Sequence, residues 1–112
     1  MREFRERSDA DVFVIDRGNG RLGGFVEAGS RPYAEGCDTT PVGYVEAWYV
    51  DEDLRRRGYG RALLQAAEDW ARLRGYREMA SDALIDNETS HRAHVASGYA
   101  EVERIVTFRK AL

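Results

Sequence analysis

Arginine and glycine are concentrated in a short segment whose residue types suit anion binding. Residues 55–61 read Arg-Arg-Arg-Gly-Tyr-Gly-Arg, so four of seven side chains are cationic and none is acidic. Gly58 and Gly60 have no side chain, which lets a ligand approach the backbone closely. The N–H groups that begin a helix have no partner within it, and the helix dipole adds partial positive charge. If a helix begins here, the segment forms a cradle for a diphosphate.

The alternative for this segment is a glycine-containing turn with solvated arginines, because short motifs also match by chance. Its surroundings favour anion binding. An apolar run at Val42–Val50 predicts a strand before it, and residues 61–74 predict a helix after it. A P-loop is disfavoured because no Gly-Lys-Ser/Thr triplet follows, and a dinucleotide loop because no GxGxxG motif is present.

Periodicity predicts which side chains these two elements present. On the strand, a period of two places Tyr44, Glu46 and Trp48 on one face. Gly75 follows the helix, at a position typical of a helix C-cap. The apolar stripe of the helix consists of Leu63, Ala66, Ala67, Trp70 and Leu73.

The remaining segments predict a mixed sheet in a single domain, residues 1–112. Gly23 and Gly24 indicate a bulge within the second strand of an early hairpin. The hairpin implies antiparallel pairing, whereas a strand–helix–strand succession implies a right-handed crossover with parallel pairing. The fold class is therefore α/β (α+β). Further elements are expected as strands at 12–15, 22–28, 78–84 and 102–110, a possible short strand around Tyr33, a turn at 18–20, and a short helix entered at 86–87 that ends at 97.

The arginine-rich loop resembles the pyrophosphate motif (Q/R)xxGx(G/A) of the GNAT superfamily of acetyl-CoA-dependent N-acetyltransferases. A second signature of that superfamily matches Asn87, His94 seven residues later, and the pair Gly98-Tyr99. The resemblance implies a mostly antiparallel sheet with helices on both faces. It also implies that a bulge splays a central parallel pair of strands, between which the pantetheine of acetyl-CoA inserts.

The same resemblance implies which residues hold acetyl-CoA. Backbone groups of Trp48, Tyr49 and Val50 would pair with the pantetheine and the thioester. The remaining cofactor-binding residues that it implies are Arg55, Arg56, Arg57, Gly58, Tyr59, Gly60, Arg61 and Asn87.

A narrower resemblance covers roughly residues 11 to 110. Runs at 33–50, 78–83, 90–94 and 101–110 are similar to one subgroup of aminoglycoside 6'-N-acetyltransferases. The resemblance implies acetyl transfer to the 6'-amine of an aminoglycoside antibiotic, and hence antibiotic resistance. It implies an acceptor site formed by Tyr33, Glu46, Asp82 and Glu103.

Amide formation from a thioester needs an unprotonated amine and a leaving thiolate that regains a proton. Glu46 is the preferred base or water-holding residue, although a strand carboxylate more commonly just faces solvent. Asp82 lies near the C-terminal end of a predicted parallel strand, where ligand sites gather, and is expected to bind the substrate ammonium, with the role of base as its rival. His94 occupies the position of a family tyrosine that protonates the thiolate, and imidazole suits that role near neutral pH. A packed or CoA-contacting histidine is an equal alternative.

The composition of the chain limits the classes of ligand and partner that are expected. The net charge is -3, and without the four loop arginines the rest of the chain carries -7, which suits a small polycationic amine and disfavours nucleic acid. His91 and His94 lack a further ligand at a matching spacing, so no metal is expected. The single cysteine, Cys37, excludes an intrachain disulfide. With neither an apolar signal-peptide core nor a run of about 20 apolar residues, no membrane association is expected and a cytoplasmic location is predicted.

The beginning of the chain departs from the family pattern. One strand and two helices commonly precede the strand near Asp11, whereas about ten residues precede it here, so a shortened N-terminal part and an exposed sheet edge are expected. Related enzymes commonly form homodimers, and the apolar segment 102–110 is expected to pair with a partner's sheet. Two alternatives stay open: acetylation of another small polyamine, and a non-catalytic acetyl-CoA-binding module.

Overall fold

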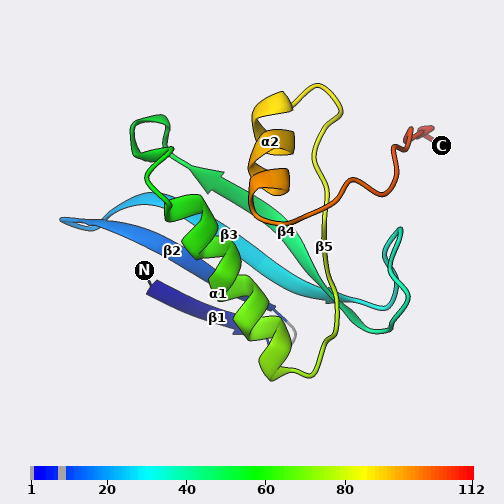
Figure 1. The fold of residues 1–112 in the computed structure, drawn as a ribbon, viewed down its shortest axis with the longest axis horizontal. Coiled ribbons are helices and arrows are strands. Elements are labelled where there is room, and N and C mark those ends of the chain that lie inside the picture. Colours follow the sequence, from blue (N-terminus) through cyan, green and yellow to red (C-terminus); the bar gives the residue numbers. More distant parts are fainter. Residues whose placement is uncertain (1, 8–9) are drawn as a thin grey trace. The chain divides into compact units, whose positions relative to one another are not determined.

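The computed structural model describes residues 2–7 and 10–112 (Figure 1). The chain divides into two compact units, one ending at Asp82 and the other beginning at Ala83. The first unit contains a five-stranded sheet, one 3-10 helix and one α-helix, and the second contains one α-helix. Neither α-helix in the described part of the chain has the length and apolar character needed to cross a membrane.

The sheet is mixed and mostly antiparallel, as the sequence predicts. Its strands lie side by side in chain order, and only β4 and β5 pair in parallel. Among the described residues no strand lies beyond β5, so the parallel pair lies at one side of the sheet and not at its centre. The five strands are β1 (Arg2–Arg7), β2 (Ala10–Gly18), β3 (Arg21–Arg31), β4 (Val42–Val50) and β5 (Met79–Ser81).

Strand β1 was not predicted, because its composition is mostly charged. It pairs antiparallel with β2, with Phe4 opposite Val12 and Arg2 opposite Val14. Strand pairing uses backbone groups, so a neighbouring strand can recruit a charged segment whose side-chain pattern gives little signal. The sheet edge expected at β2 is therefore covered by β1.

The hairpin between β2 and β3 contains both features that its glycines predict, the turn at 18–20 and a bulge in the second strand. Gly18, Asn19 and Gly20 have φ values of 90°, 54° and 74°, which suit a tight turn. The register moves from Ile15 opposite Gly24 to Asp16 opposite Leu22, so Gly23 is the extra residue of a bulge. A Cβ atom at Gly23 would lie 2.4 Å from the Leu54 side chain, so this position must stay small for the loop after β4 to pack here.

Helix α1 (Tyr59–Leu73) crosses one face of the sheet and contacts β2, β3 and β4 (Figure 1). The predicted apolar stripe is confirmed in part, because Leu73 is 90% exposed at the end of the helix. Gly75 follows with a φ of 82°, as expected beyond a helix end. The helical residues buried against the sheet are Leu63, Leu64, Ala67, Trp70 and Ala71.

The predicted strands at 78–84 and 102–110 differ from the structure. Strand β5 contains three residues, and no helix or strand follows Ala96 in the described chain. Side chains of Val102, Ile105, Val106 and Phe108 are at least 62% exposed. A β-rich composition supplies a propensity, but a strand needs a neighbour that completes its backbone hydrogen bonds. Residues around Tyr33 likewise form no strand.

In the second unit, helix α2 (Glu88–Ala96) begins after Asn87 as predicted and ends one residue before the predicted position 97. The side-chain oxygen of Asn87 accepts a hydrogen bond from the Ser90 N–H at 3.1 Å, so Asn87 caps the helix N-terminus. Gly98 adopts a φ of 93° beyond the helix end.

Candidate functional site

Strand β4 contains a bulge at Glu46. Val45 lies opposite Ala28 and Ala47 lies opposite Glu27, so Glu46 has no counterpart on β3. Successive side chains of β3 alternate between the two faces of the sheet without interruption. The register therefore places Trp48 on the same face of the sheet as Val45. The prediction that Tyr44, Glu46 and Trp48 share one face is therefore wrong for Trp48, since one extra residue reverses the alternation beyond it.

The parallel ladder between β4 and β5 stops at the same point. Val45 pairs with Ser81, while β4 continues to Val50. Among the described strands, none pairs with residues 46–50 on that side of β4. The sequence prediction of a bulged β4 and a splayed parallel pair is confirmed, because the ladder between β4 and β5 ends at the bulge.

The arginine-rich loop leads from the end of β4 through the 3-10 helix η1 (Glu52–Leu54) into α1. Gly58 is the N-cap of α1, with φ 86° and ψ 0°, and its carbonyl accepts the Ala62 N–H at 3.0 Å. A Cβ atom at Gly58 would meet nothing within 4 Å, so the backbone there is open. Arg56 also has a positive φ, of 63°, and together with Arg57 and Arg61 it is exposed. These features are the backbone geometry that the sequence predicts for an anion site, an open glycine loop at the N-terminus of a 15-residue helix.

Two residues predicted to bind the cofactor also hold this loop in place. The indole N–H of Trp48 donates to the Gly60 carbonyl at 3.2 Å, and a Cβ atom at Gly60 would lie 3.2 Å from the indole ring. Arg55 Nε donates to the Val50 carbonyl at 2.8 Å, and its guanidinium lies 5.6 Å from the centre of the Tyr49 ring. Tyr49 and Tyr59 are exposed beside the loop.

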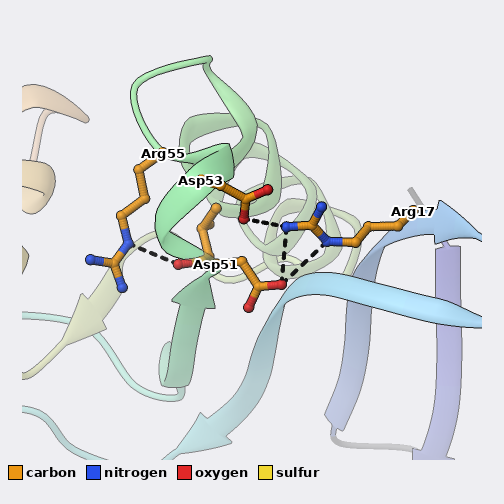
Figure 2. A network of polar contacts seen from close by, with 5 residues as sticks. Arg17, Asp51, Asp53 and Arg55 are labelled. Carbon is orange, nitrogen blue, oxygen red and sulfur yellow. Dashed lines mark hydrogen bonds and ion pairs between the residues drawn. The ribbon is translucent and has the colours of Figure 1, made fainter.

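Arg17 anchors the start of the loop, a role that the sequence did not reveal (Figure 2). Its Nε and Nη2 atoms lie 3.3 and 3.2 Å from Asp51 Oδ2, and Nη2 also binds Asp53. The hydrogen bond from Arg17 lowers the pKa of Asp53 below its usual value. Asp51 and Asp53 are ion-paired to a residue more than 30 positions away, and no local pattern signals such a pairing.

Replacing Arg17 with glutamine should weaken CoA binding about two- to fivefold, because two aspartates then lose their cation and η1 is held less firmly. Calorimetric titration with CoA measures this effect. Arg21→Gln is the matched control, since Arg21 is an exposed arginine of the same hairpin that lies outside the network of Figure 2. Equal CoA affinities for the two variants would contradict the anchoring role.

A second polar cluster brings the two predicted carboxylates into one network. Arg31 donates from Nε to Glu46 Oε2 at 2.9 Å and from Nη2 to Glu46 Oε1 at 2.7 Å. The same guanidinium lies 3.6 Å from the centre of the Tyr44 ring. The Tyr44 hydroxyl donates to Asp82 Oδ2 at 2.9 Å. Burial, with help from Asp82, raises the pKa of Tyr44 to about 12, so the phenol remains a donor at neutral pH. No motif of the sequence marks Arg31 or Tyr44 as a site residue.

The segment between β3 and β4 is held by Glu78, which precedes β5. Its carboxylate accepts the N–H groups of Asp38 and Thr39 at 2.8 and 2.7 Å, and hydrogen bonds from Thr39 lower its pKa. Burial and the nearby Glu78 raise the pKa of Cys37, which keeps it a thiol. Tyr33 lies in this segment with 66% of its surface exposed.

The second unit contains the other predicted site residues. His94 Nδ1 lies 2.7 Å from the Ser90 carbonyl, so it donates there, and its Nε2 can supply a proton only when the ring is an imidazolium. His91 Nε2 donates to the Leu84 carbonyl at 2.8 Å. Glu103 is exposed in the segment after α2. In the described part of the chain, no three histidine, cysteine or acidic side chains come together as metal ligands.

A bulged β4, a strand ladder that stops at the bulge, and a glycine loop at a helix N-terminus define one class of protein. The chain belongs to the family described as "Acetyltransferase (GNAT) family", which matches residues 1–99.

Within this family, the chain is similar to proteins named as aminoglycoside acetyltransferases. The chain is 46% identical over 103 residues to the aminoglycoside N(6')-acetyltransferase type 1 of Klebsiella aerogenes, a match that covers 92% of this chain and 68% of that protein. It is 41% identical to the protein of the same name from Stenotrophomonas maltophilia, over 94% of this chain and 69% of the relative.

Among solved structures, aminoglycoside 6'-N-acetyltransferase AAC(6')-IG from Acinetobacter haemolyticus superposes with a TM-score of 0.85 at 34% identity, covering 95% of this chain and 73% of that one. AAC(6')-Iy in complex with the bisubstrate analogue CoA-S-monomethyl-acetylneamine superposes with a TM-score of 0.87 at 34% identity, covering 95% and 72%.

Proposed function

We propose that this protein is an N-acetyltransferase that transfers the acetyl group of acetyl-CoA to the 6'-amino group of an aminoglycoside. The observation that carries the proposal is the construction of β4. One bulged strand has the paired side chains of Glu46 and Arg31 at its bulge and leads, beyond its end, through a glycine loop into the N-terminus of α1. A thioester placed along the end of that strand would lie between a phosphate site and a cation site. The relatives at 41 to 46% identity bear the name of this activity.

In the proposed reaction the amine nitrogen attacks the thioester carbonyl, the new C–N bond replaces the C–S bond, the amine loses a proton, and the CoA thiolate gains one. The pyrophosphate would bind at residues 55–61, and the pantetheine would lie along Trp48, Tyr49 and Val50. Asn87 is the further cofactor-binding residue that the family resemblance implies. Asp82 would bind the acceptor ammonium, alongside Tyr33 and Glu103. Glu46 would act as base or hold a water, and His94 would protonate the thiolate.

An assay of CoA release with aminoglycosides that have or lack a free 6'-amine tests the proposal. Acetylation only of those with the amine, and a raised inhibitory concentration in a susceptible bacterium that expresses the protein, are the expected results. Acetylation that persists without the 6'-amine would overturn the regiochemistry and favour a broader polyamine acceptor. Tight CoA binding without turnover of any amine would instead favour a non-catalytic acetyl-CoA-binding module.

We further propose that the chain forms a homodimer. Support comes from the exposed apolar side chains of Ile105, Val106 and Phe108, in a β-rich segment that could pair with the sheet of a partner. Light scattering should give about twice the chain mass of 12.7 kDa. Phe108→Asp should shift the population towards the monomer, because it charges that segment. Leu84→Asp, at another exposed apolar residue, should leave the dimer intact. A soluble, folded monomer of the unmodified chain would contradict the proposal.

A further inference from the structure

We propose that Arg31 is a positioning residue of the acceptor site, because its one guanidinium fixes Glu46 at the bulge of β4 and lies against Tyr44, whose hydroxyl fixes Asp82. This inference rests on the proposed function, and it deepens the description of that same site. It gives a role to two residues that neither the motifs nor the spacing of the sequence singled out.

The contact between Arg31 and Glu46 has the geometry of a planar fork. Two donors of the guanidinium reach the two oxygens of the carboxylate at 2.9 and 2.7 Å, so Glu46 can neither rotate nor translate without breaking a hydrogen bond. Glu46 is also the extra residue of the bulge, and its carboxylate oxygen would lie 3.5 Å from a Cβ atom at Gly29. The Glu46 side chain therefore packs directly over the backbone of Gly29.

The Arg31 guanidinium is linked to Asp82 through the ring of Tyr44. It lies 3.6 Å from the centre of the Tyr44 ring, within the range of a cation–π contact. Tyr44 is only 4% exposed, so its ring is held by the core and its hydroxyl has a fixed direction. That hydroxyl donates to Asp82 Oδ2. Asp82 itself is exposed and follows the end of β5, so this hydrogen bond limits the positions that its carboxylate can take.

The positive charge of Arg31 and the hydrogen-bond geometry of its guanidinium should affect the site in different ways. Two substitutions at Arg31 distinguish these effects. Glutamine removes the cation and the fork, so the site gains one net negative charge while its carboxylates lose their anchor. Lysine keeps the cation but cannot make two parallel contacts or lie flat on a ring. A residue that only stabilised the fold would lower the active fraction, and thus kcat, with neither substitution changing the KM for the acceptor.

The test measures kcat and KM with neamine and acetyl-CoA as substrates. For Arg31→Gln we expect the KM for neamine to fall about two- to fivefold through added attraction, and kcat to fall about tenfold or more. For Arg31→Lys the KM for neamine should return to the parental value while kcat stays low. The KM for acetyl-CoA should be unchanged in both, and Arg21→Gln should behave as the parent. Parental kcat for Arg31→Gln, or a lower kcat with an unchanged KM for neamine, would overturn the inference.

Calorimetric titration of neamine into the CoA complex supplies a readout that does not depend on turnover. Arg31→Gln should bind neamine about two- to fivefold more tightly than the parent, and Arg31→Lys should match the parent. An unmodified chain that fails to acetylate neamine would overturn the proposed function, while these affinities would still decide the role of Arg31. Equal affinities for the parent and Arg31→Gln would overturn the role of Arg31.

Discussion

Gly58→Val is expected to weaken CoA binding about tenfold or more. Gly58 has a φ of 86°, where a β-branched residue is strained by about 1 to 3 kcal/mol, and each 1.4 kcal/mol is about tenfold in affinity. Valine would either pull the loop out of the conformation that aims its N–H groups at the pyrophosphate, or project a side chain into the open space in front of them. Calorimetric titration with CoA measures the loss.

Gly75→Val is the matched control for this variant. Gly75 has nearly the same φ, 82°, and equally open space around its Cβ position, but it lies at the opposite end of α1. Both variants should lower the melting temperature by similar amounts, and only Gly58→Val should lose CoA affinity. A Gly58→Val protein that binds CoA as the parent does, or a Gly75→Val protein that binds as poorly, would contradict the assignment of the pyrophosphate to this loop.

Asp82→Asn is expected to raise the KM for the aminoglycoside about tenfold, with a smaller effect on kcat. The amide oxygen of asparagine can still accept the hydrogen bond from Tyr44, so the substitution removes the charge and largely keeps the geometry. A polycationic acceptor thereby loses one ion pair in a site where the other nearby carboxylate, Glu46, is already bound to Arg31. Steady-state kinetics with the aminoglycoside varied at saturating acetyl-CoA measures the change.

Asp38→Asn provides the control, since it removes the same charge from an exposed aspartate of the first unit outside the cluster of Arg31, Tyr44, Glu46 and Asp82. A uniform effect of net charge on a polycation would raise the KM equally in both variants. Parental kinetics for Asp82→Asn would show that the acceptor amine binds elsewhere. A large fall in kcat at constant KM would assign Asp82 the role of base.

The short-range patterns of the sequence determined the elements that carry the loop. Strand β4 has the predicted bounds, Val42–Val50, because alternation and β-branched residues are sufficient to specify an extended segment. Asn87 caps α2 and Gly75 follows α1 as predicted, since caps and left-handed turns depend on one residue and its nearest neighbours. The glycine loop at the start of α1 was predictable for the same reason, because its residues lie within seven consecutive positions.

Tertiary structure alone decided how the proposed acceptor site is organised. The bulge at Glu46 exists only as a register between β3 and β4, and it reversed the predicted face of Trp48. Arg17 meets Asp51 across 34 positions, Arg31 meets Glu46 across 15, and Tyr44 meets Asp82 across 38. Such pairs leave no periodic signal, because each depends on which strands become neighbours. Strand pairing likewise recruited the charged segment Arg2–Arg7 as β1 and left the β-rich residues 102–110 without a strand, since a ladder needs a backbone partner as well as a suitable composition.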